Sequence, residues 1–298
     1  MTNGTQMKCY MVAGLLAGLG LGFTPAADEA PGVVRIAIVK SLFRDVDDSL
    51  IPAAVRPMKE LMEDQIGLAG DLVPVGDADA VASQVKGGKA QFGVFQGVEF
   101  AWIHAAFPTL KPLVIAVNRS PFLRAHLVVR ANGKIAAAAD LKGKVVGLPR
   151  KSRIHCVLFL ERRCCPEKET PDKFFSKVSA PGSAEDALDE VVDDEAQGAV
   201  VDEAAFEDYQ KNKPGRASKL KSLDHSESFP CVVVVYQQGD PSDKTLATLR
   251  DGLLAAKDSG KAELLLRKNH ITGYEITPSD YEKQLAEIAK AYPAPGGK

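Results

Sequence analysis

The sequence predicts an α/β protein built from two similar lobes. Short apolar, β-branched runs alternate with amphipathic helical segments, and this alternation occurs twice along the chain. Two further apolar strands bracket the second occurrence, as expected if the chain leaves one lobe and later returns to it. With 298 residues, of which 45% are apolar, the chain is long enough to form two hydrophobic cores. We therefore expect two mostly parallel sheets, each flanked by helices, with a cleft between the lobes.

The first half of the chain begins with the apolar run Val33–Val39, which we expect to be a buried strand. Pro52 can begin a helix whose apolar face includes Val55 and Leu61 and which ends by Gly67. The remaining elements predicted for this half are a strand at Leu72–Val73, a helix after Asp77, a strand at Ala90–Phe95, a helix containing Phe100 and Ile103, and a strand at Leu113–Val117.

The second half repeats this pattern with different residues. A turn and strand are predicted at Asp140–Gly147, a helix capped by Ser183, and a strand at Gly198–Asp202. The strands His126–Arg130 and Cys231–Tyr236 bracket this half, so they are predicted to join the lobes as two hinge strands. The resulting boundaries are 33–123 plus 232–292 for lobe I and 124–231 for lobe II.

The N-terminus is typical of a secretory signal peptide. Lys8 precedes the apolar run Met11–Phe23, and small residues follow at Thr24–Ala27. This run is shorter than the roughly 20 apolar residues that a transmembrane helix needs. We expect residues 1–26 to be removed and the mature protein to be soluble in the periplasm or another extracytoplasmic space.

Charge is distributed unevenly along the chain. The formal net charge of −2 gives no general attraction to nucleic acid or to anionic lipid. Cations are concentrated in residues 150–153 and 211–221, the second of which is predicted to be a solvated basic loop. Any preference for an anion must therefore be local.

The stretch Gly147–Cys165, GLPRKSRIHCVLFLERRCC, contains the predicted binding site. Its polar part lies between the carboxyl end of a strand and the start of a helix, where ligands of open α/β sheets gather. The unpaired N–H groups of a helix start favour an anion. Nearby cations and a hydroxyl strengthen that preference, and the predicted anion socket consists of Arg150, Lys151, Ser152 and Arg153. The alternative is a solvated loop with only some of these side chains pointing inward.

The same stretch does not have the pattern of a catalytic or metal site. His155 and Cys156 are neighbours on a helix and point in different directions, which makes them a poor nucleophile–base pair. The sequence has no Gly-x-Ser-x-Gly, HExxH or CxxC motif. We therefore expect no catalytic residue, no metal and no cofactor. The alternative is a metal bound by His155, Cys156 and Cys231, for which the sequence has no spacing signature. His155 is predicted to be a cap or a hydrogen-bond donor in the pocket.

The cysteines allow two interpretations. On a single helix Cys156 and Cys164 would be about 12 Å apart along the axis, too far for a disulfide. The adjacent pair Cys164–Cys165 would be strained. A bridge between Cys156 and Cys231 is the leading pairing, and the alternative is that the cysteines are buried and unpaired.

The order of these segments resembles the phosphate/phosphite/phosphonate solute-binding proteins of ATP-driven (ABC) importers. The most specific match is the strand within Leu123–Asn132, followed a few residues later by DLKGKVVG at Asp140–Gly147. The resemblance implies the type II periplasmic-binding fold. It also implies a secreted, monomeric, non-enzymatic receptor that captures a small oxyanion and delivers it to a membrane permease. Alternatives on the same scaffold are a ligand sensor for a signalling kinase and an enzyme.

The resemblance also suggests which other residues face the ligand. Ser152–His155 replaces the family's Ser/Thr-rich run, and Gln96–Phe100 replaces a Gly-Pro-Leu-Ser-Tyr-like turn, with Phe100 at the tyrosine position. An acid near Asp202 can face ligand in the family, although it can equally cap the next helix. Together with Glu99 it suggests a ligand with donor groups as well as negative charge. Ser41 and Phe43, after the first strand, complete the predicted wall.

Overall fold

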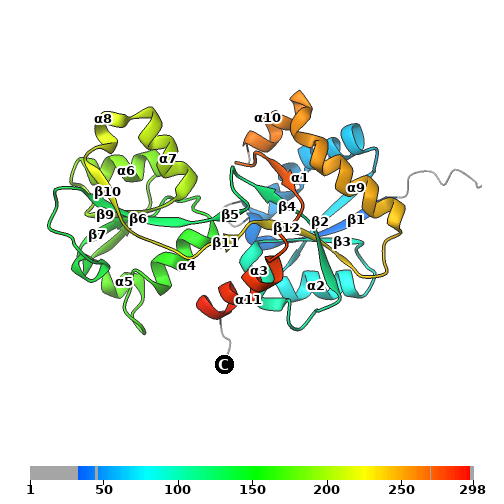
Figure 1. Cartoon of the computed structure of the whole chain (residues 1–298), viewed down its shortest axis with the longest axis horizontal. Helices are drawn as coiled ribbons and strands as arrows, with labels where there is room; N and C mark the ends of the chain where they lie inside the picture. The colour runs from blue at the N-terminus through cyan, green and yellow to red at the C-terminus, as the bar shows by residue number, and fades with distance from the viewer. Residues whose placement is uncertain (1–32, 44–45, 269, 296–298) are drawn as a thin grey trace, which may run out of the picture. The chain divides into compact units, whose positions relative to one another are not determined.

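The structure is a computed structural model that describes residues 33–43, 46–268 and 270–295. Over these residues the chain forms one six-stranded sheet, one five-stranded sheet and a small two-stranded sheet (Figure 1). The predicted signal segment 1–26 lies outside the described residues. Within the described part, no helix has the length and apolar character needed to cross a membrane.

Lobe I is the six-stranded sheet with the helices packed on it. Its strands are β1 Val34–Val39, β2 Gly70–Gly76, β3 Phe92–Phe95, β4 Leu110–Val117, β12 Val232–Gln237 and β13 Gly273–Glu275. Its helices are α1 Ile51–Leu61, α2 Ala78–Lys86, α3 Gly97–Ile103, α9 Asp243–Ala255, α10 Gly260–Lys268 and α11 Tyr281–Ala291. The strand order is β13-β4-β12-β3-β1-β2.

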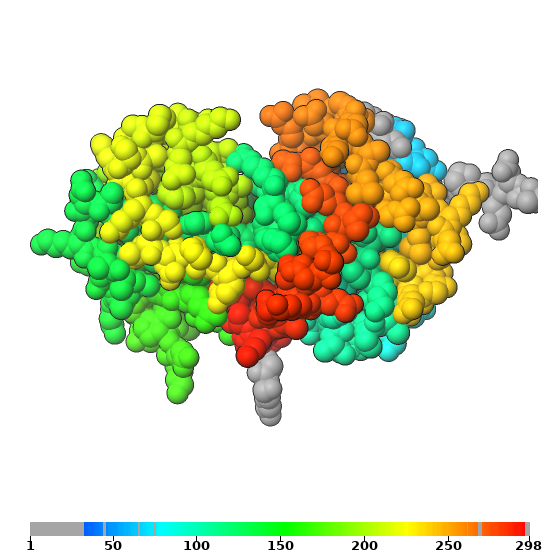
Figure 2. All heavy atoms as spheres, in the orientation of Figure 1, coloured from blue at the N-terminus to red at the C-terminus, as the bar shows by residue number. Residues whose placement is uncertain are grey.

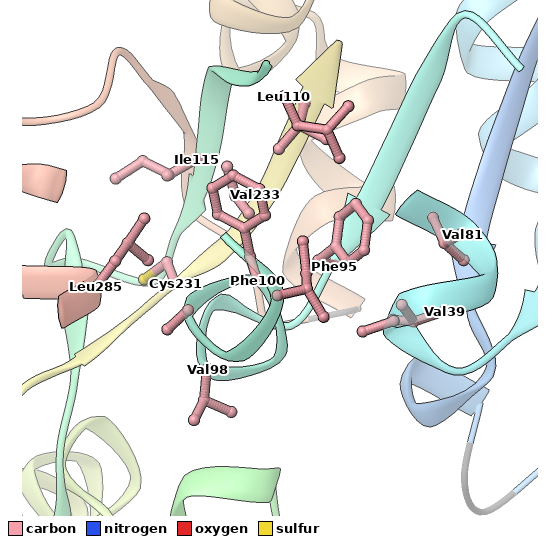
Figure 3. Close-up of a cluster of buried hydrophobic side chains, with 14 of the residues drawn as sticks. Val39, Val81, Phe95, Val98, Phe100, Leu110, Ile115, Cys231, Val233 and Leu285 are labelled. Atoms are coloured by element: carbon pink, nitrogen blue, oxygen red, sulfur yellow. The ribbon is translucent and has the colours of Figure 1, made fainter. Parts of the chain in front are cut away.

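Apolar side chains on both faces of this sheet bury it between two helical layers. In β12, Val233 and Val235 join the core formed with α2, α3 and α11, whereas Val234 joins the core formed with α1, α9 and α10. Because successive side chains of a strand point to opposite faces, a strand covered on both sides is apolar throughout. This explains the unbroken valine run of β12. Figure 3 shows the first of these cores, with Phe95, Leu110 and Val233 pointing inward.

Lobe II is the five-stranded sheet with its own helices. Its strands are β6 Ala125–Arg130, β7 Val145–Gly147, β8 Lys177–Ser179, β9 Gly198–Asp202 and β10 Leu220–His225. Its helices are α4 Ile154–Arg162, α5 Pro171–Phe174, α6 Ala184–Val192, α7 Glu203–Asn212 and α8 Pro214–Ala217. The strand order is β10-β6-β9-β7-β8. This sheet also lies between two apolar clusters, one with α4 and α5 and one with α6, α7 and α8.

The direction of the strands brings the polar turns of each lobe together. β12 is antiparallel to both β3 and β4, so β1, β2, β3 and β4 all run the same way. In lobe II, β7 is parallel to both β8 and β9, while β6 is antiparallel to β9. The segments after β1, β3 and β4 therefore share one edge of lobe I, and those after β7 and β9 share one edge of lobe II.

The strands that join the lobes are shorter than the sequence predicted. β5 Phe122–Leu123 and β11 Phe229–Pro230 pair antiparallel as a separate two-stranded sheet. The predicted joining strands, which became β6 and β12, instead lie inside the two large sheets. They are apolar because helices cover them, and the crossing itself needs only a few residues on each pass. α11, red in Figure 1, packs against α3 and β11 beside this crossing.

The predicted basic loop at 211–221 is also replaced by ordered structure. This segment ends α7, forms α8 and begins β10. Lys213 Nζ lies 2.7 Å from Asp189 Oδ2, and Arg216 Nε lies 2.6 Å from Asp189 Oδ1. Asp189 belongs to α6; Glu185 lies one turn before it in the helix, and Asp193, the C-cap residue, lies one turn after it. Lys213 and Arg216 thus pair with an acidic helix face within lobe II, whereas Lys211 and Lys219 are exposed.

Candidate functional site

The start of α4 holds the predicted anion socket, and the structure separates its members. Arg150 is exposed, and its Nε donates to the carbonyl oxygen of Ala180 at 2.9 Å; Lys151 is exposed as well. Ser152 and Arg153 are half-buried. Arg153 Nη2 donates to the carbonyl oxygen of His270 at 2.8 Å, and His270 belongs to lobe I. Arg153 is therefore the cation of the socket that reaches from one lobe to the other.

His155 lies directly beneath this segment and is almost completely buried, with 1% of its surface exposed. Its Nε2 lies 3.0 Å from Asp202 Oδ2 and 3.4 Å from the Sγ of Cys156. The Nδ1 atom is buried and has no hydrogen-bond partner among the described residues. The ring packs 5.8 Å from that of Phe229 in the joining strand β11. His155 thus fixes the position of Asp202 and connects the start of α4 with the crossing.

Asp202 ends β9 and caps α7. Its Oδ1 accepts a hydrogen bond from the backbone amide of Ala204 at 3.0 Å, so the predicted capping role is present together with the His155 contact. Burial acts to raise the pKa of this carboxyl group. The hydrogen bond and charge of His155, the charge of Arg153 and the Ala204 amide outweigh burial and hold the pKa of Asp202 below its ordinary value. Asp202 is therefore a stable anion at this edge of lobe II.

Glu99 is the corresponding acid of lobe I, and its environment has the opposite effect. It lies in the first turn of α3, is 8% exposed and accepts a hydrogen bond from Ser41 Oγ at 2.7 Å. Burial raises the pKa of Glu99; the hydrogen bonds from Ser41 and from the Gln96 backbone lower it but do not compensate. Ser41 and Glu99 are thus brought together, as expected from two turns that end parallel strands.

The prediction that Phe100 faces the ligand requires a correction. Phe100 is completely buried and packs with Phe95 in the lobe I core, where Figure 3 shows it pointing inward. Its correspondence to the family's tyrosine position suggested a pocket residue, but the side chain lies on the helix face that covers the sheet. Phe43 is half-buried and packs against the core on the other face of the same sheet. Phe100 therefore supports the fold and does not line a surface.

The predicted disulfide is not present. Cys156 and Cys231 are thiols, as are Cys164 and Cys165, and all four are buried. Cys231 Sγ donates to the carbonyl oxygen of Ser120 at 3.6 Å, and burial raises the pKa of the Cys231 thiol to about 12. Both residues are buried, as in the alternative prediction that the cysteines belong to the core. Among the described residues no group of His, Cys, Asp and Glu is arranged to hold a metal ion.

A hollow of about 150 Å³ opens beside the crossing. Its lining combines the turn after β4 and strand β5 with the start of α7: Asn118, Arg119, Ser120, Phe122, Leu123, Arg124, Asp202, Glu203, Ala204 and Glu207. On the face seen in Figure 2, a notch separates the yellow-green atoms of α7 and α8 from the orange atoms of α10. The sequence did not predict the lining from Arg124 and Glu203. The sequence shows only that a charged residue follows each of two strands, Arg124 after β5 and Glu203 after β9. The pairing of β6 with β9 brings these two residues close together.

Comparison with protein families identifies the class of this chain. Residues 43–281 match the family model of the ABC transporter, phosphonate, periplasmic substrate-binding proteins. The chain belongs to this family, which is one of transport receptors located outside the cytoplasm. No curated protein sequence matches the chain.

Solved structures support the same two-lobed fold. PhnD1 from Prochlorococcus marinus, in complex with methylphosphonate, is 15% identical with a TM-score of 0.55, and the match covers 87% of this chain and 98% of that one. A Xanthomonas citri protein bound to ATP is 17% identical with a TM-score of 0.54, covering 87% and 96%. A binding-protein component of an ABC phosphonate transporter from Pseudomonas aeruginosa is 15% identical with a TM-score of 0.52, covering 87% and 85%.

Proposed function

We propose that this protein captures a small phosphonate-like oxyanion outside the cytoplasm for an ABC importer. Family membership supports a solute-binding role, and one structural observation carries the choice of an anion. Arg153, at the start of the nine-residue helix α4, lies at the carboxyl end of β7 and reaches across to lobe I. A guanidinium group beside unpaired helix N–H groups suits an oxygen-rich anion.

The proposed contacts come from both lobes. Ser152 and Arg153 approach the anion from α4, and Asp202, held by His155, faces any donor group that the ligand carries. Ser41 and Glu99 contribute the polar edge of lobe I. Arg150 and Lys151 are exposed, and they add positive potential without being fixed in the site. Arg153 is therefore the cation that we propose to contact the anion directly.

A thermal-shift panel tests the proposal directly. The probes are methylphosphonate, aminoethylphosphonate, phosphite, phosphate, sulfate and small carboxylates. A ligand present at 100 times its dissociation constant stabilises the folded protein by about 2.7 kcal/mol. We expect at least one phosphorus oxyanion to give such a shift, and the absence of a shift with every anion would contradict the proposal.

Two matched variants locate the site. Arg153→Gln removes the cation that spans the lobes, whereas Arg150→Gln removes a neighbouring cation whose side chain is exposed. We expect Arg153→Gln to weaken binding of the responding anion at least tenfold, equivalent to about 1.4 kcal/mol. Arg150→Gln should change it less than threefold. Equal loss of affinity in the two variants would show that the anion does not bind at the start of α4.

The same proposal includes the cellular context of the protein. We infer that residues 1–26 direct export and are removed, and that the mature monomer docks on a membrane permease. Mass spectrometry of the protein recovered from the periplasm should show an N-terminus close to residue 27. Recovery of the full-length chain only from the cytoplasm would contradict this part of the proposal.

A further inference from the structure

Arg119 has an unusual backbone conformation for a non-glycine residue. It follows β4 with a φ of 66°, in the left-handed region that residues with a Cβ seldom adopt. Its backbone amide donates to Thr272 Oγ1 at 2.9 Å, and that hydroxyl donates to the carbonyl oxygen of Val117 at 3.2 Å. Strained conformations of this kind persist where surrounding contacts impose them. The hydrogen bonds of Thr272 thus hold the Arg119 backbone in this conformation within lobe I.

The Arg119 side chain reaches helix α7 of lobe II. Nη2 lies 2.6 Å from Asp208 Oδ1, and Nη1 lies 3.6 Å from Glu207 Oε2. Nη1 also donates to the carbonyl oxygen of Ala204 at 3.5 Å. One guanidinium group therefore contacts two carboxylates and a carbonyl group of the same helix. We call this group, Arg119 with Ala204, Glu207 and Asp208, the α7 latch.

The α7 latch differs from the contacts at the crossing itself. Arg124 lies 3.4 Å from Glu203 and 3.1 Å from Ser228, so it connects the two joining segments at the axis where the lobes meet. Asp208 lies five residues after Glu203 along α7, a rise of about 7.5 Å, so the Arg119 contact is displaced along the helix from the Arg124 contact. Both side chains of the Arg119–Asp208 pair remain about half exposed. A contact away from the axis breaks when the lobes rotate apart, whereas a contact at the axis is retained.

Asp202, the anion held by His155, is also the N-cap residue of helix α7. The same rigid helix therefore carries the proposed ligand edge at its start and the latch carboxylates one to two turns later. We propose that the α7 latch stabilises the closed arrangement of the two lobes and that its closure is coupled to ligand binding through α7. The coupling to affinity rests on the proposed function; the effect on lobe closure does not.

Distances between the lobes in the ligand-free protein provide the test. Spin labels attached to an unnatural amino acid at the exposed positions Lys219, in lobe II, and Lys244, in α9 of lobe I, report the populations of closed and open molecules. Arg119→Asn removes the positive charge and shortens the side chain so that it no longer contacts α7. Asn tolerates the left-handed backbone conformation of this position. An ion pair that is half exposed changes an equilibrium by about two- to fivefold, so we expect the closed-to-open ratio to fall by that factor.

Two further variants distinguish a latch from general damage. Arg119→Asp combined with Asp208→Arg reverses the pair and should restore the closed population. Arg130→Asn removes an arginine of similar exposure, 42% against 45%, whose ion pair with Asp194 lies within lobe II, and it should leave the distances unchanged. An unchanged distribution in Arg119→Asn, or an equal change in Arg130→Asn, would overturn the proposal.

The consequence for binding is measured separately. The apparent dissociation constant scales inversely with the fraction of molecules competent to close. For the anion that responds in the thermal-shift panel, Arg119→Asn should weaken binding about two- to fivefold, and the reversed pair should restore it. If Arg119→Asn alters the distances between the lobes but not the affinity for the anion, the latch stabilises closure but is not coupled to ligand binding. If no anion binds at all, the distance measurement still decides the latch.

Discussion

The starts of α3 and α4 occupy equivalent positions in the two lobes, yet they differ in what they offer to a ligand. Each follows a strand of the same direction and begins at the carboxyl edge of its sheet. At the start of α3, a Cβ on Gly97 would overlap the backbone carbonyl groups of Pro230 and Cys231, so the returning chain closes over the helix. The start of α4 carries half-buried Ser152 and Arg153 beside two exposed cations. Equivalent topology thus gives one covered and one open helix start.

The acids at the two edges show the same contrast in electrostatic terms. Burial raises the pKa of Glu99, which has a neutral hydroxyl group as its side-chain partner. Asp202 is half-buried, and although burial acts to raise its pKa, an imidazole and a nearby guanidinium group lower it. The difference shows that burial alone does not decide the charge of a carboxyl group at such an edge. The partners that the neighbouring strand and helix supply decide it.

The largest expected effect comes from filling the covered helix start. In Gly97→Ala the new methyl group must displace backbone atoms of the returning chain, which should destabilise the fold by about 3 kcal/mol. Gly147→Ala at the end of β7 is the matched control, because there the nearest atom, the Cβ of Ala187, would be 3.5 Å away. Urea unfolding should show a loss below about 1 kcal/mol for the control. Equal losses of unfolding free energy in the two variants would mean that the returning chain does not cover the start of α3 more closely than other segments cover the end of β7.

The next effect follows from removing the charge of Asp202. Asp202→Asn leaves the α7 cap in place but loses the charged hydrogen bond to buried His155, at a cost of about 1.5–3 kcal/mol. A lowered carboxyl pKa contributes stability that is present above the ordinary value, near 3.9, and is lost as the pH falls through the folded-state value. The difference between wild type and variant should therefore shrink below about pH 4 in chemical unfolding. A difference that is independent of pH would contradict the ionic assignment.

Glu99→Gln should have a smaller effect and the opposite pH dependence. Because the pKa of Glu99 is raised by burial, wild type loses stability as the pH rises from the ordinary glutamate value through the folded-state value. The amide that replaces this carboxyl group would retain an acceptor for Ser41 without the buried charge. In chemical unfolding, the variant should gain stability relative to wild type as the pH rises above about 4, the ordinary glutamate value. Parallel pH profiles for the two proteins would show that Glu99 titrates as it does in water.

The smallest effect is expected from a reductant. A disulfide typically contributes about 2–4 kcal/mol, so a bridge from α4 to the returning chain would be evident on reduction. Since Cys156 and Cys231 are buried thiols, dithiothreitol should leave the unfolding midpoint of the mature protein unchanged. Alkylation after denaturation should modify every cysteine without prior reduction. A midpoint that falls on reduction would show that the two regions are covalently joined.

Much of the fold was predictable from local patterns. The apolar runs at β1, β3, β4 and β12 and the capped helices α2 and α6 were visible because buried strands and amphipathic helices have short-range periodicities. The placement of Ser41 and Glu99 at one edge followed from the rule that parallel strands end together, whereas their hydrogen bond to each other was not predicted. The orientation of Phe100 and the pairing of Arg119 with Asp208 were not predictable. Each depends on which face of a helix meets a partner far away in the sequence.

The sequence by itself determined the two-lobed α/β class, the family, and the placement of the polar turns at the carboxyl ends of strands. Those features follow from periodicity and from short motifs, which are encoded within a few residues of each other. Only the tertiary structure decided which cation spans the lobes, which acids are buried with which partners, and which cysteines are simply core residues. These properties depend on distances between segments that are far apart along the chain, because burial and charge pairing act through space.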